Sequence, residues 1–267
     1  MLTVLDADAL SRNLSRDDGE LMKSELLKKF KPRTVLTTFQ HVCTLFSWGV
    51  KCGFLDENPF KGIRRPVPIR TEKAYVSMDM YRAILDACPT QEWRVLVALC
   101  RIGGLRYPSE VRLLTWGDIT WDKGRGTVLV HSPKTDCHPG KGSRLVPLWP
   151  ILRTELEALY VQAVRKGKQR IITLFDDLDD KSFRLKVEGV LCDVIRKAGL
   201  KPWRMMFNTM RANASTDIAN DPKFGPLCES IWLGHSHEVA EKHYLQITPE
   251  QNEWAVTHGV AAAQISQ

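Results

Sequence analysis

Histidine, glutamate and tyrosine crowd into one short stretch near the C-terminus, GHSHEVAEKHYLQ at residues 234–246. Within it, HEVAE at 237–241 differs by one residue from HExxH, a helical motif in which two histidines bind zinc. The stretch also carries a hydroxyl group, on Tyr244, of the kind that can act as a covalent nucleophile. Which chemistry it performs depends on the polar residues that join it from elsewhere in the chain.

The position of Tyr244 follows from the helix predicted around it. Ser236 is a favourable N-cap for a helix over 236–246, which places His235 at the junction with the preceding helix. Tyr244 then shares a helix face with His237. A tyrosine in this setting is, taken alone, more often a buried core residue, so a nucleophile requires partners from other segments.

Arg106 is the first candidate partner. It follows an apolar helix predicted over 91–102 and the paired glycines 103–104, whose backbone can turn tightly and let another group approach. The arginine therefore sits at the end of a buried element, just before a short helix predicted over 109–114. A purely structural arginine paired with Glu110 is the alternative reading, and this segment alone leaves both open.

Lys134 and Arg211 are two further candidate cations, and predicted elements place each of them. Lys134 directly follows a strand predicted over 127–131, in a loop at 132–143 that leads to a second strand over 144–148. Asn208 can cap a helix over 208–220, which puts Arg211 one turn inside it, on the same face. A positive charge near a helix N-terminus is mildly unfavourable and indicates an anionic neighbour. A solvated lysine is the alternative for Lys134.

These residue types together fit chemistry on a phosphodiester. Arginine forks match pairs of phosphate oxygens. A lysine or histidine can donate a proton or hydrogen bond to an oxygen that gains charge. A tyrosine can split one transfer into two steps. No step requires a metal ion or a cofactor, so none is predicted.

The bulk composition agrees with a nucleic-acid partner. The 267 residues are 43% hydrophobic and 26% charged, as in soluble globular proteins, and no apolar run is long enough for a membrane helix. The net charge is +7 and the pI is about 9.0, which favours an acidic partner. The seven cysteines contain no CxxC pair and are interpreted as reduced thiols in a cytoplasmic protein.

The elements that must hold the candidate residues divide the chain in two. Residues 5–55 are predicted to be helical, with one apolar face over 34–53 formed by Val35, Phe39, Val42, Leu45, Phe46 and Val50. The segment 56–70 has three prolines and is interpreted as an extended linker. Beyond it, helices are predicted at 77–87, 91–102, 109–114, 151–166, 182–198, 208–220, 228–233 and 236–246. The fold class is mainly α with a small antiparallel sheet (α+β).

Five motifs in order now resemble those of the tyrosine recombinases, the phage-integrase family of site-specific recombinases. They are GGLRYPSEVRLLTWGDI, SPKT followed by RLVPL, NTMR, LGHS and KHYLQ. FSWGVKCGFLDENPF resembles the end of the helical core-binding domain of that family. The likeness covers the chain from about residue 30 to about residue 250.

The resemblance implies a domain plan and a set of site residues. A short, SAM-like core-binding domain would occupy 1–62, a linker 63–74, and a catalytic domain with a C-terminal tail 75–267. The implied catalytic residues are Arg106, Lys134, Asn208, Arg211, His235 and the nucleophile Tyr244. Candidate DNA contacts from the helical domain are Lys31, Arg33 and Gln40. The implied partner is double-stranded DNA, bound by a homotetramer in the cytoplasm, with no membrane, metal or small-molecule cofactor.

Two positions depart from the family pattern. Asn208 stands where the HxxR motif has its histidine, and an amide cannot serve as a base near neutral pH. One extra residue separates Arg106 from Glu110 relative to the commoner RxxE spacing.

Three rival functions stay open beside the recombinase. The first is a DNA-binding remnant or regulator that has lost cleavage, which Asn208 favours. The second is a nicking enzyme like the type IB topoisomerases. The third is a zinc hydrolase built on His235, His237 and His243, in which Glu241 replaces the second histidine of HExxH.

Overall fold

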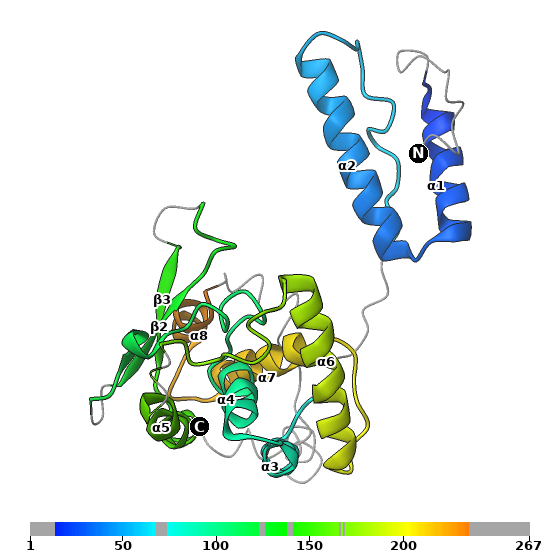
Figure 1. Ribbon diagram of the computed structural model, residues 1–267. Coiled ribbons are helices and arrows are strands. Elements are labelled where there is room, and N and C mark those ends of the chain that lie inside the picture. The colour runs from blue at the N-terminus through cyan, green and yellow to red at the C-terminus, as the bar shows by residue number, and fades with distance from the viewer. Residues whose placement is uncertain are drawn as a thin grey trace, which may run out of the picture. The chain divides into compact units, whose positions relative to one another are not determined.

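The computed structural model describes residues 14–67, 74–122, 126–137, 141–165, 167 and 169–234 of the 267-residue chain. The chain divides into two compact units, Met1–Glu72 and Lys73–Gln267 (Figure 1). All seven cysteines are free. None of the helices in the described ranges has the length and apolar character needed to cross a membrane.

The smaller unit is a pair of helices, α1 (Arg16–Lys29) and α2 (Pro32–Lys51). Ser15 and Asp18 form a capping box at the start of α1, and Pro32 occupies the first turn of α2, where its missing N–H costs nothing. The apolar face predicted for α2 is confirmed at most positions but wrong at Leu45, which is 58% exposed. Buried Gly49 lies on that face instead, because α2 packs close to the following chain there.

The chain after α2 helps to build the core of the smaller unit. Phe60 and Ile63 are buried among the apolar residues of α1 and α2. The Phe60 ring contacts Phe46 at 4.7 Å and Phe39 at 6.1 Å between centroids. The first half of the segment interpreted as a linker therefore packs onto the helices, because its two large apolar side chains gain more from burial than from exposure.

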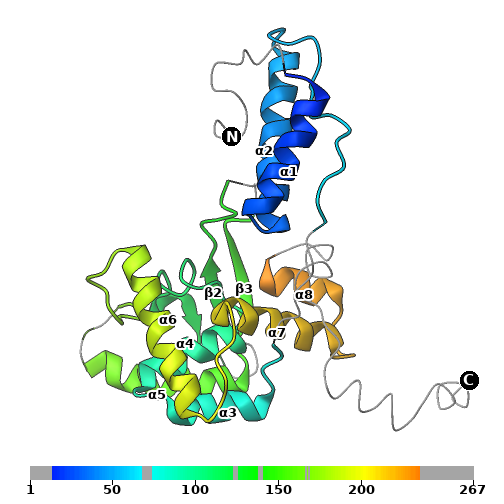
Figure 2. The ribbon, with the colours of Figure 1, turned by 90° about the vertical axis from the view of Figure 1, so that its right-hand side faces the viewer.

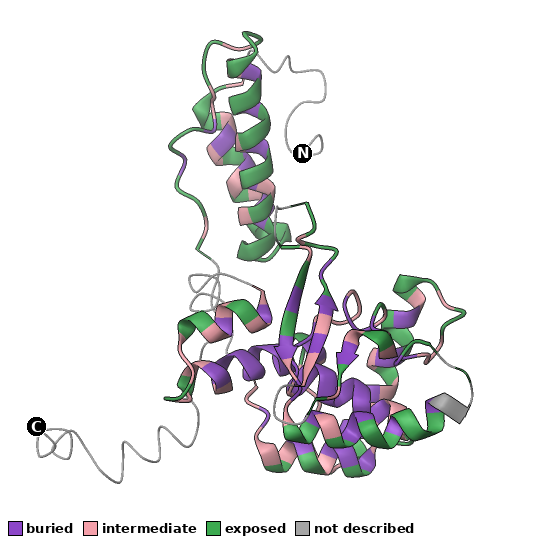
Figure 3. Cartoon of the chain, turned by 90° about the vertical axis from the view of Figure 1, so that its left-hand side faces the viewer, coloured by how far each residue is buried: buried purple, intermediate pink, exposed green. Residues whose placement is uncertain are grey.

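The larger unit surrounds one buried helix. It contains α3 (Met78–Ala87), α4 (Gln91–Arg101), α5 (Pro150–Arg165), α6 (Asp180–Lys197), α7 (Met206–Asn220) and α8 (Pro226–Leu233). Helix α4 runs between α5 and α7, and its residues from Val95 to Arg101 are all buried (Figures 1 and 2). Figure 3 shows the buried residues concentrated in the sheet and in the helices packed against it.

The sheet has three antiparallel strands in the order β1-β2-β3. They are β1 (Ile119–Thr120), β2 (Thr127–His131) and β3 (Ser143–Pro147), and β1 was not predicted from the sequence. Val128 pairs with Val146 and Val130 pairs with Arg144. All four side chains are buried, so an arginine lies on the apolar face of the sheet.

Two local predictions are wrong. The helix expected over 109–114 is a run of turns, in which the N–H groups of Glu110 and Arg112 bond the carbonyls of Arg106 and Pro108. The Glu110 side chain also accepts from the Arg106 backbone N–H, which favours a turn here. Asn208 is not an N-cap. Helix α7 begins at Met206 after Met205 in the left-handed region, which leaves Asn208 exposed in the first turn.

Gly104 provides a test of how tightly the elements meet. Its φ is +63°, and a Cβ added there would lie 2.3 Å from Cδ2 of Leu233 at the end of α8. We expect Gly104→Ala to lower the free energy of unfolding by about 1–3 kcal/mol, through backbone strain and overpacking. Gly189→Ala is the matched control, because Gly189 lies inside α6 with open space around its Cα. It should stabilise by about 0.5–1 kcal/mol in the same urea titration.

Candidate active site of the larger unit

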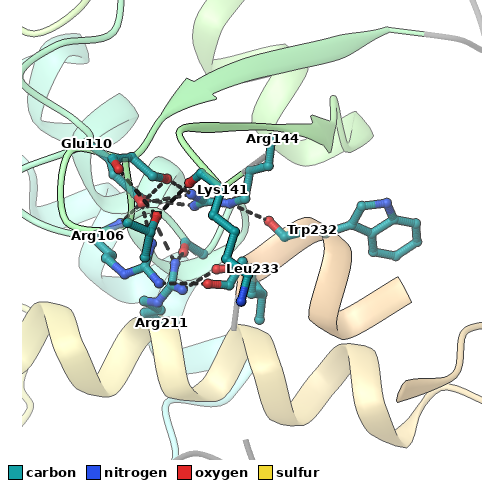
Figure 4. A network of polar contacts seen from close by, with 11 residues as sticks. Arg106, Glu110, Lys141, Arg144, Arg211, Trp232 and Leu233 are labelled. Carbon is teal, nitrogen blue, oxygen red and sulfur yellow. Dashed lines mark hydrogen bonds and ion pairs between the residues drawn. The ribbon is translucent and has the colours of Figure 1, made fainter. Parts of the chain in front are cut away.

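Arg106 and Arg211 come together although 105 positions separate them in the sequence. Arg106 follows α4 after the turn at Gly103 and Gly104, and Arg211 lies in the first half of α7. Both guanidinium groups converge on the carboxylate of Glu110, at 2.6 Å for Arg106 Nη1 and 3.9 Å for Arg211 Nη1 (Figure 4). The structure thus brings together the two arginines that the sequence singled out.

Glu110 is the centre of this cluster and is only 1% exposed. Its Oε2 accepts from the Arg106 backbone N–H at 2.7 Å, and its Oε1 accepts from the Ser132 hydroxyl at 2.9 Å. Arg144 donates to both carboxylate oxygens, each at 2.7 Å. The carboxylate therefore joins the turn after α4 to both strands of the hairpin.

Arg144 belongs to this cluster, although the sequence reasoning did not single it out. It comes from β3, opposite Val130, on the buried face of the sheet. Besides Glu110, it donates through Nη1 to the Ser132 hydroxyl at 2.5 Å. The signal was present in the sequence, since strict alternation along RLVP puts Arg144 and Val146 on the same face. A charge at an inward position indicates a buried partner.

The end of α8 supplies three consecutive carbonyl groups to three different arginines. The Trp232 carbonyl accepts from Arg144 Nε at 2.8 Å, and the Gly234 carbonyl accepts from Arg106 Nη2 at 3.0 Å. Between them, the Leu233 carbonyl accepts from Nη2 of Arg211. Last-turn carbonyls lack partners within their own helix and carry partial negative charge, so they suit cations. Arg211 also donates to the carbonyl of Gly104.

The charge state of Glu110 follows from these neighbours. Burial alone would raise the pKa of its carboxyl group. The hydrogen bonds and charge of Arg144, with the charges of Arg211 and Arg106, outweigh burial and lower this pKa to about 2. Glu110 is therefore ionised at neutral pH, as expected for a residue that braces Arg106 rather than acting as an acid.

Lys134 lies on an exposed turn, two residues after Ser132. The turn is closed by the Thr135 N–H, which donates to the Ser132 carbonyl at 3.0 Å. The Thr135 hydroxyl also donates to the carbonyl of Lys141 at 2.6 Å, and Figure 4 shows Lys141 beside the arginine network. The start of the hairpin loop is thus hydrogen-bonded to Glu110 through Ser132, and the loop leaves Lys134 exposed to solvent.

The remaining predicted residues fall into two groups. Lys31, Arg33 and Gln40 are exposed on the smaller unit, and Gln40 lines a shallow groove with Thr44, Ser47 and Arg65. His235 and Tyr244 lie outside the described residues, as do His237, Glu241 and His243 of the zinc alternative. Among the residues that are described, no three metal-binding side chains gather.

The sequence comparisons identify a relative but no family. No family model matches the chain. The protein named "Putative defective protein IntQ" of Escherichia coli (strain K12) is 31% identical over 166 residues, which cover 57% of this chain. The chain spans only 40% of the length of IntQ.

The solved structures show the fold. A lambda integrase dimer bound to a COC′ core site superposes with a TM-score of 0.67 and 16% identity, covering 92% of this chain and 87% of that one. The Tn1549 transposon integrase bound to circular intermediate DNA gives 0.65 and 17%, covering 93% and 86%. The resemblance inferred from the sequence motifs is confirmed at the level of the fold. The chain has the tyrosine recombinase fold, mainly helical with a small antiparallel sheet.

The lowered pKa of Glu110 makes a prediction about acid stability. Ionised Glu110 stabilises the fold fully above its ordinary pKa of 4.5, and this contribution is lost as the pH falls toward 2. We expect Glu110→Gln to lower the free energy of unfolding at pH 7 by about 3–5 kcal/mol, because the buried Arg144 and Arg211 and the half-buried Arg106 lose their counter-charge. The gap between the two proteins should shrink between pH 4.5 and pH 2 in denaturant titrations.

The control for this experiment is Glu157→Gln. Glu157 pairs with Arg153 at 2.7 Å on the surface, with 53% of its side chain exposed. Surface pairs contribute about 0–1 kcal/mol, so this variant should follow the wild type at every pH. A gap for Glu110→Gln that stays constant over the acid range would contradict the assigned pKa.

Proposed function

We propose that this chain is a site-specific DNA recombinase that cuts and rejoins double-stranded DNA through a covalent 3′-phosphotyrosine at Tyr244. The observation that supports it most is the meeting of Arg106 and Arg211 at the last carbonyls of α8. The last of these carbonyls belongs to Gly234, which is followed directly by His235, and Tyr244 lies nine positions after His235. A pair of cations is therefore fixed at the point where the chain enters the segment with the proposed nucleophile.

The cluster places several guanidinium groups side by side, which suits an anionic substrate. Arg144 holds the Glu110 carboxylate with two N–H groups. Arg106 and Arg211 lie at the same carboxylate, at 2.6 and 3.9 Å, so their positive charges are held close to one another. A phosphodiester carries one negative charge and gains more on its equatorial oxygens in the transition state. Preorganised arginines stabilise that charge without rearranging.

The first chemical step exchanges one ester bond for another. The Tyr244 hydroxyl oxygen attacks the phosphorus and forms a 3′-phosphotyrosyl bond, while the bond to the 5′-oxygen breaks. Lys134 donates a proton to the leaving 5′-oxygen, and the tyrosine proton passes to solvent or a neighbouring base. Arg106, Arg211 and His235 bind the non-bridging oxygens. Asn208 orients the phosphate or the tyrosine, since an amide can hydrogen-bond either one.

The second step reverses the first with a different strand. The 5′-hydroxyl of a partner strand attacks the phosphotyrosine, restores a phosphodiester and releases Tyr244. The number of ester bonds is unchanged, so the exchange needs no nucleotide hydrolysis. Strand exchange requires several active sites on paired duplexes, and we propose a homotetramer on DNA. A lambda integrase tetramer bound to a Holliday junction shares this fold, with a TM-score of 0.67.

The smaller unit, as the proposed core-binding domain, would supply further DNA contacts. Lys31 and Arg33 are exposed around the start of α2, and Gln40 lies two turns further along it. Lysine and arginine bind phosphates, whereas glutamine can read the edge of an adenine. These three side chains therefore suit a surface that follows a duplex.

A DNA-binding protein without cleavage is the second candidate function. Asn208 supports it, because this exposed amide replaces the histidine that the family uses near the tyrosine. The name of the relative, "Putative defective protein IntQ", fits the same idea for that protein. Such a protein would bind DNA with the same salt dependence and form no covalent adduct.

Tyr244→Phe tests the proposed nucleophile. The protein is incubated in EDTA with a pool of nicked duplexes of randomised sequence, and protein–DNA adducts are collected under denaturing conditions. We expect wild-type adducts to enrich a common sequence, and Tyr244→Phe to give none while its affinity for the enriched duplex is unchanged. An adduct-free wild type that still binds DNA would establish the second candidate instead. Adducts lost only in EDTA would support a metal-dependent enzyme.

Lys31→Gln and Arg33→Gln test the DNA surface of the smaller unit. Each lost phosphate contact should reduce the slope of log K against log salt by about 0.9 and weaken binding on all sequences alike. Fluorescence anisotropy over a salt series measures both quantities. Lys197→Gln, on an exposed side chain at the end of α6, is the charge-matched control. A slope change equal to that of the control would exclude these contacts.

A further inference from the structure

Arg144 contacts three of the segments that hold the site together. It reaches Glu110 in the turn after α4, Ser132 at the end of the hairpin, and the Trp232 carbonyl on α8. We propose that Arg144 is a positioning residue, which sets the geometry of Arg106 and Arg211 without touching the DNA. This inference rests on the proposed function, because the geometry that it sets is that of the phosphate-binding arginines.

The hydrogen bonds of Arg144 separate it from the other two arginines. Its Nε and both terminal nitrogens donate to acceptors of the protein, and its charge faces the carboxylate directly. Its side chain is 6% exposed, against 18% for Arg106. Arg211 is as buried, but it donates to the carbonyls of Gly104 and Leu233, and its Nη1 lies 3.9 Å from Glu110. Arg144 is the arginine whose guanidinium group donates to both oxygens of the Glu110 carboxylate.

Arg144 orients Arg106 through Glu110. The two parallel N–H groups of Arg144 fix the plane of the carboxylate. In that orientation, Oε2 meets the backbone N–H of Arg106 and Oε1 meets its Nη1. The backbone N–H and the guanidinium group of Arg106 thus both donate to the carboxylate that Arg144 orients.

Arg144 also orients the acceptors at the end of α8. Its Nε bonds the Trp232 carbonyl, and the next two carbonyls receive Arg211 and Arg106. Gly234, with φ of +65°, packs against the Arg144 side chain, since an added Cβ would lie 3.1 Å from its Cδ. The guanidinium group of Arg144 therefore helps to fix both acceptors of the Arg106 side chain, which are the Glu110 carboxylate and the Gly234 carbonyl.

Arg144→Met and Arg144→Lys separate positioning from charge. Methionine removes the charge and the hydrogen bonds, whereas lysine keeps a charge beside Glu110 but cannot donate from two parallel N–H groups. We expect single-turnover adduct formation at saturating DNA to slow by about 100-fold or more in Arg144→Met, with DNA affinity unchanged, because small misplacements of catalytic groups have effects of this size. Arg144→Lys should stay slow although Glu110 remains ionised.

Arg94→Met is the matched control for loss of a large ion pair. Arg94 holds Glu155 with two hydrogen bonds, at 2.9 and 2.7 Å, on the side of α4 that carries none of the site residues. This variant should lose stability but cleave at the wild-type rate. All rates are compared at a temperature where each variant is folded by circular dichroism.

A second measurement needs no DNA cleavage. The carboxyl carbon of Glu110, assigned in ¹³C-glutamate-labelled protein with Glu110→Gln, reports its titration. The side-chain Nε–H signal of Arg106 reports how that arginine is held. We expect Arg144→Met to move the Glu110 titration to higher pH and to shift the Arg106 signal. Arg94→Met should change neither.

The outcomes distinguish this inference from the proposed function. Wild-type cleavage by Arg144→Met, or an unchanged Arg106 signal in it, would overturn the positioning role. Loss of DNA affinity in step with the cleavage rate would show a phosphate contact and also overturn it. If the wild type forms no adduct, the proposed enzyme fails, and the Arg106 and Glu110 signals alone decide whether Arg144 orients the pair.

Discussion

The site depends on one buried carboxylate, Glu110, that faces three arginines. Removing a carboxylate from water is costly, and only close charges with well-directed hydrogen bonds offset that cost. Here the hydrogen bonds come from the turn after α4, from Ser132 next to β2 and from Arg144 on β3, and the charge of Arg211 on α7 lies 3.9 Å away. Four segments far apart in the sequence therefore each place a group within 3.9 Å of the Glu110 carboxylate. A substitution that moves one of these groups would alter the position of the others through Glu110.

The end of α8 complements the carboxylate from the other side. A helix of eight residues has few internal hydrogen bonds, and its last carbonyls would be unsatisfied in a buried setting. The arginines satisfy three of them, so the cations that we propose bind or position a phosphate also stabilise the helix end. Gly234 in the left-handed region ends the helix there and directs the chain toward His235. The arginine side chains that complete the hydrogen bonding at the end of α8 are thus the ones assigned to the proposed site.

Much of this arrangement was predictable from local sequence signals. Helical periodicity and caps such as Ser77 gave α2 to α7 nearly to their observed ends, and the paired glycines marked Arg106. The predictions that failed depended on backbone conformation and side-chain direction, which hydrophobic periodicity does not show. The turns at 107–113 follow from the inward direction of Glu110, and the start of α7 from the backbone of Met205. Leu45 shows the same limit, because periodicity gives a stripe but not which edge of it meets the partner helix.

Asn208 and Arg211 show how binding and proton transfer can separate in such a fold. They lie one turn apart on α7, yet Asn208 is exposed and Arg211 is buried with its hydrogen bonds made to the protein. A change at 208 therefore alters a solvent-facing side chain and leaves the arginine cluster intact. The arrangement of Arg106 and Arg211, which we propose binds the phosphate, does not depend on that residue. In the proposed reaction, a substitution at position 208 would therefore change proton transfer and leave phosphate binding by the two arginines in place.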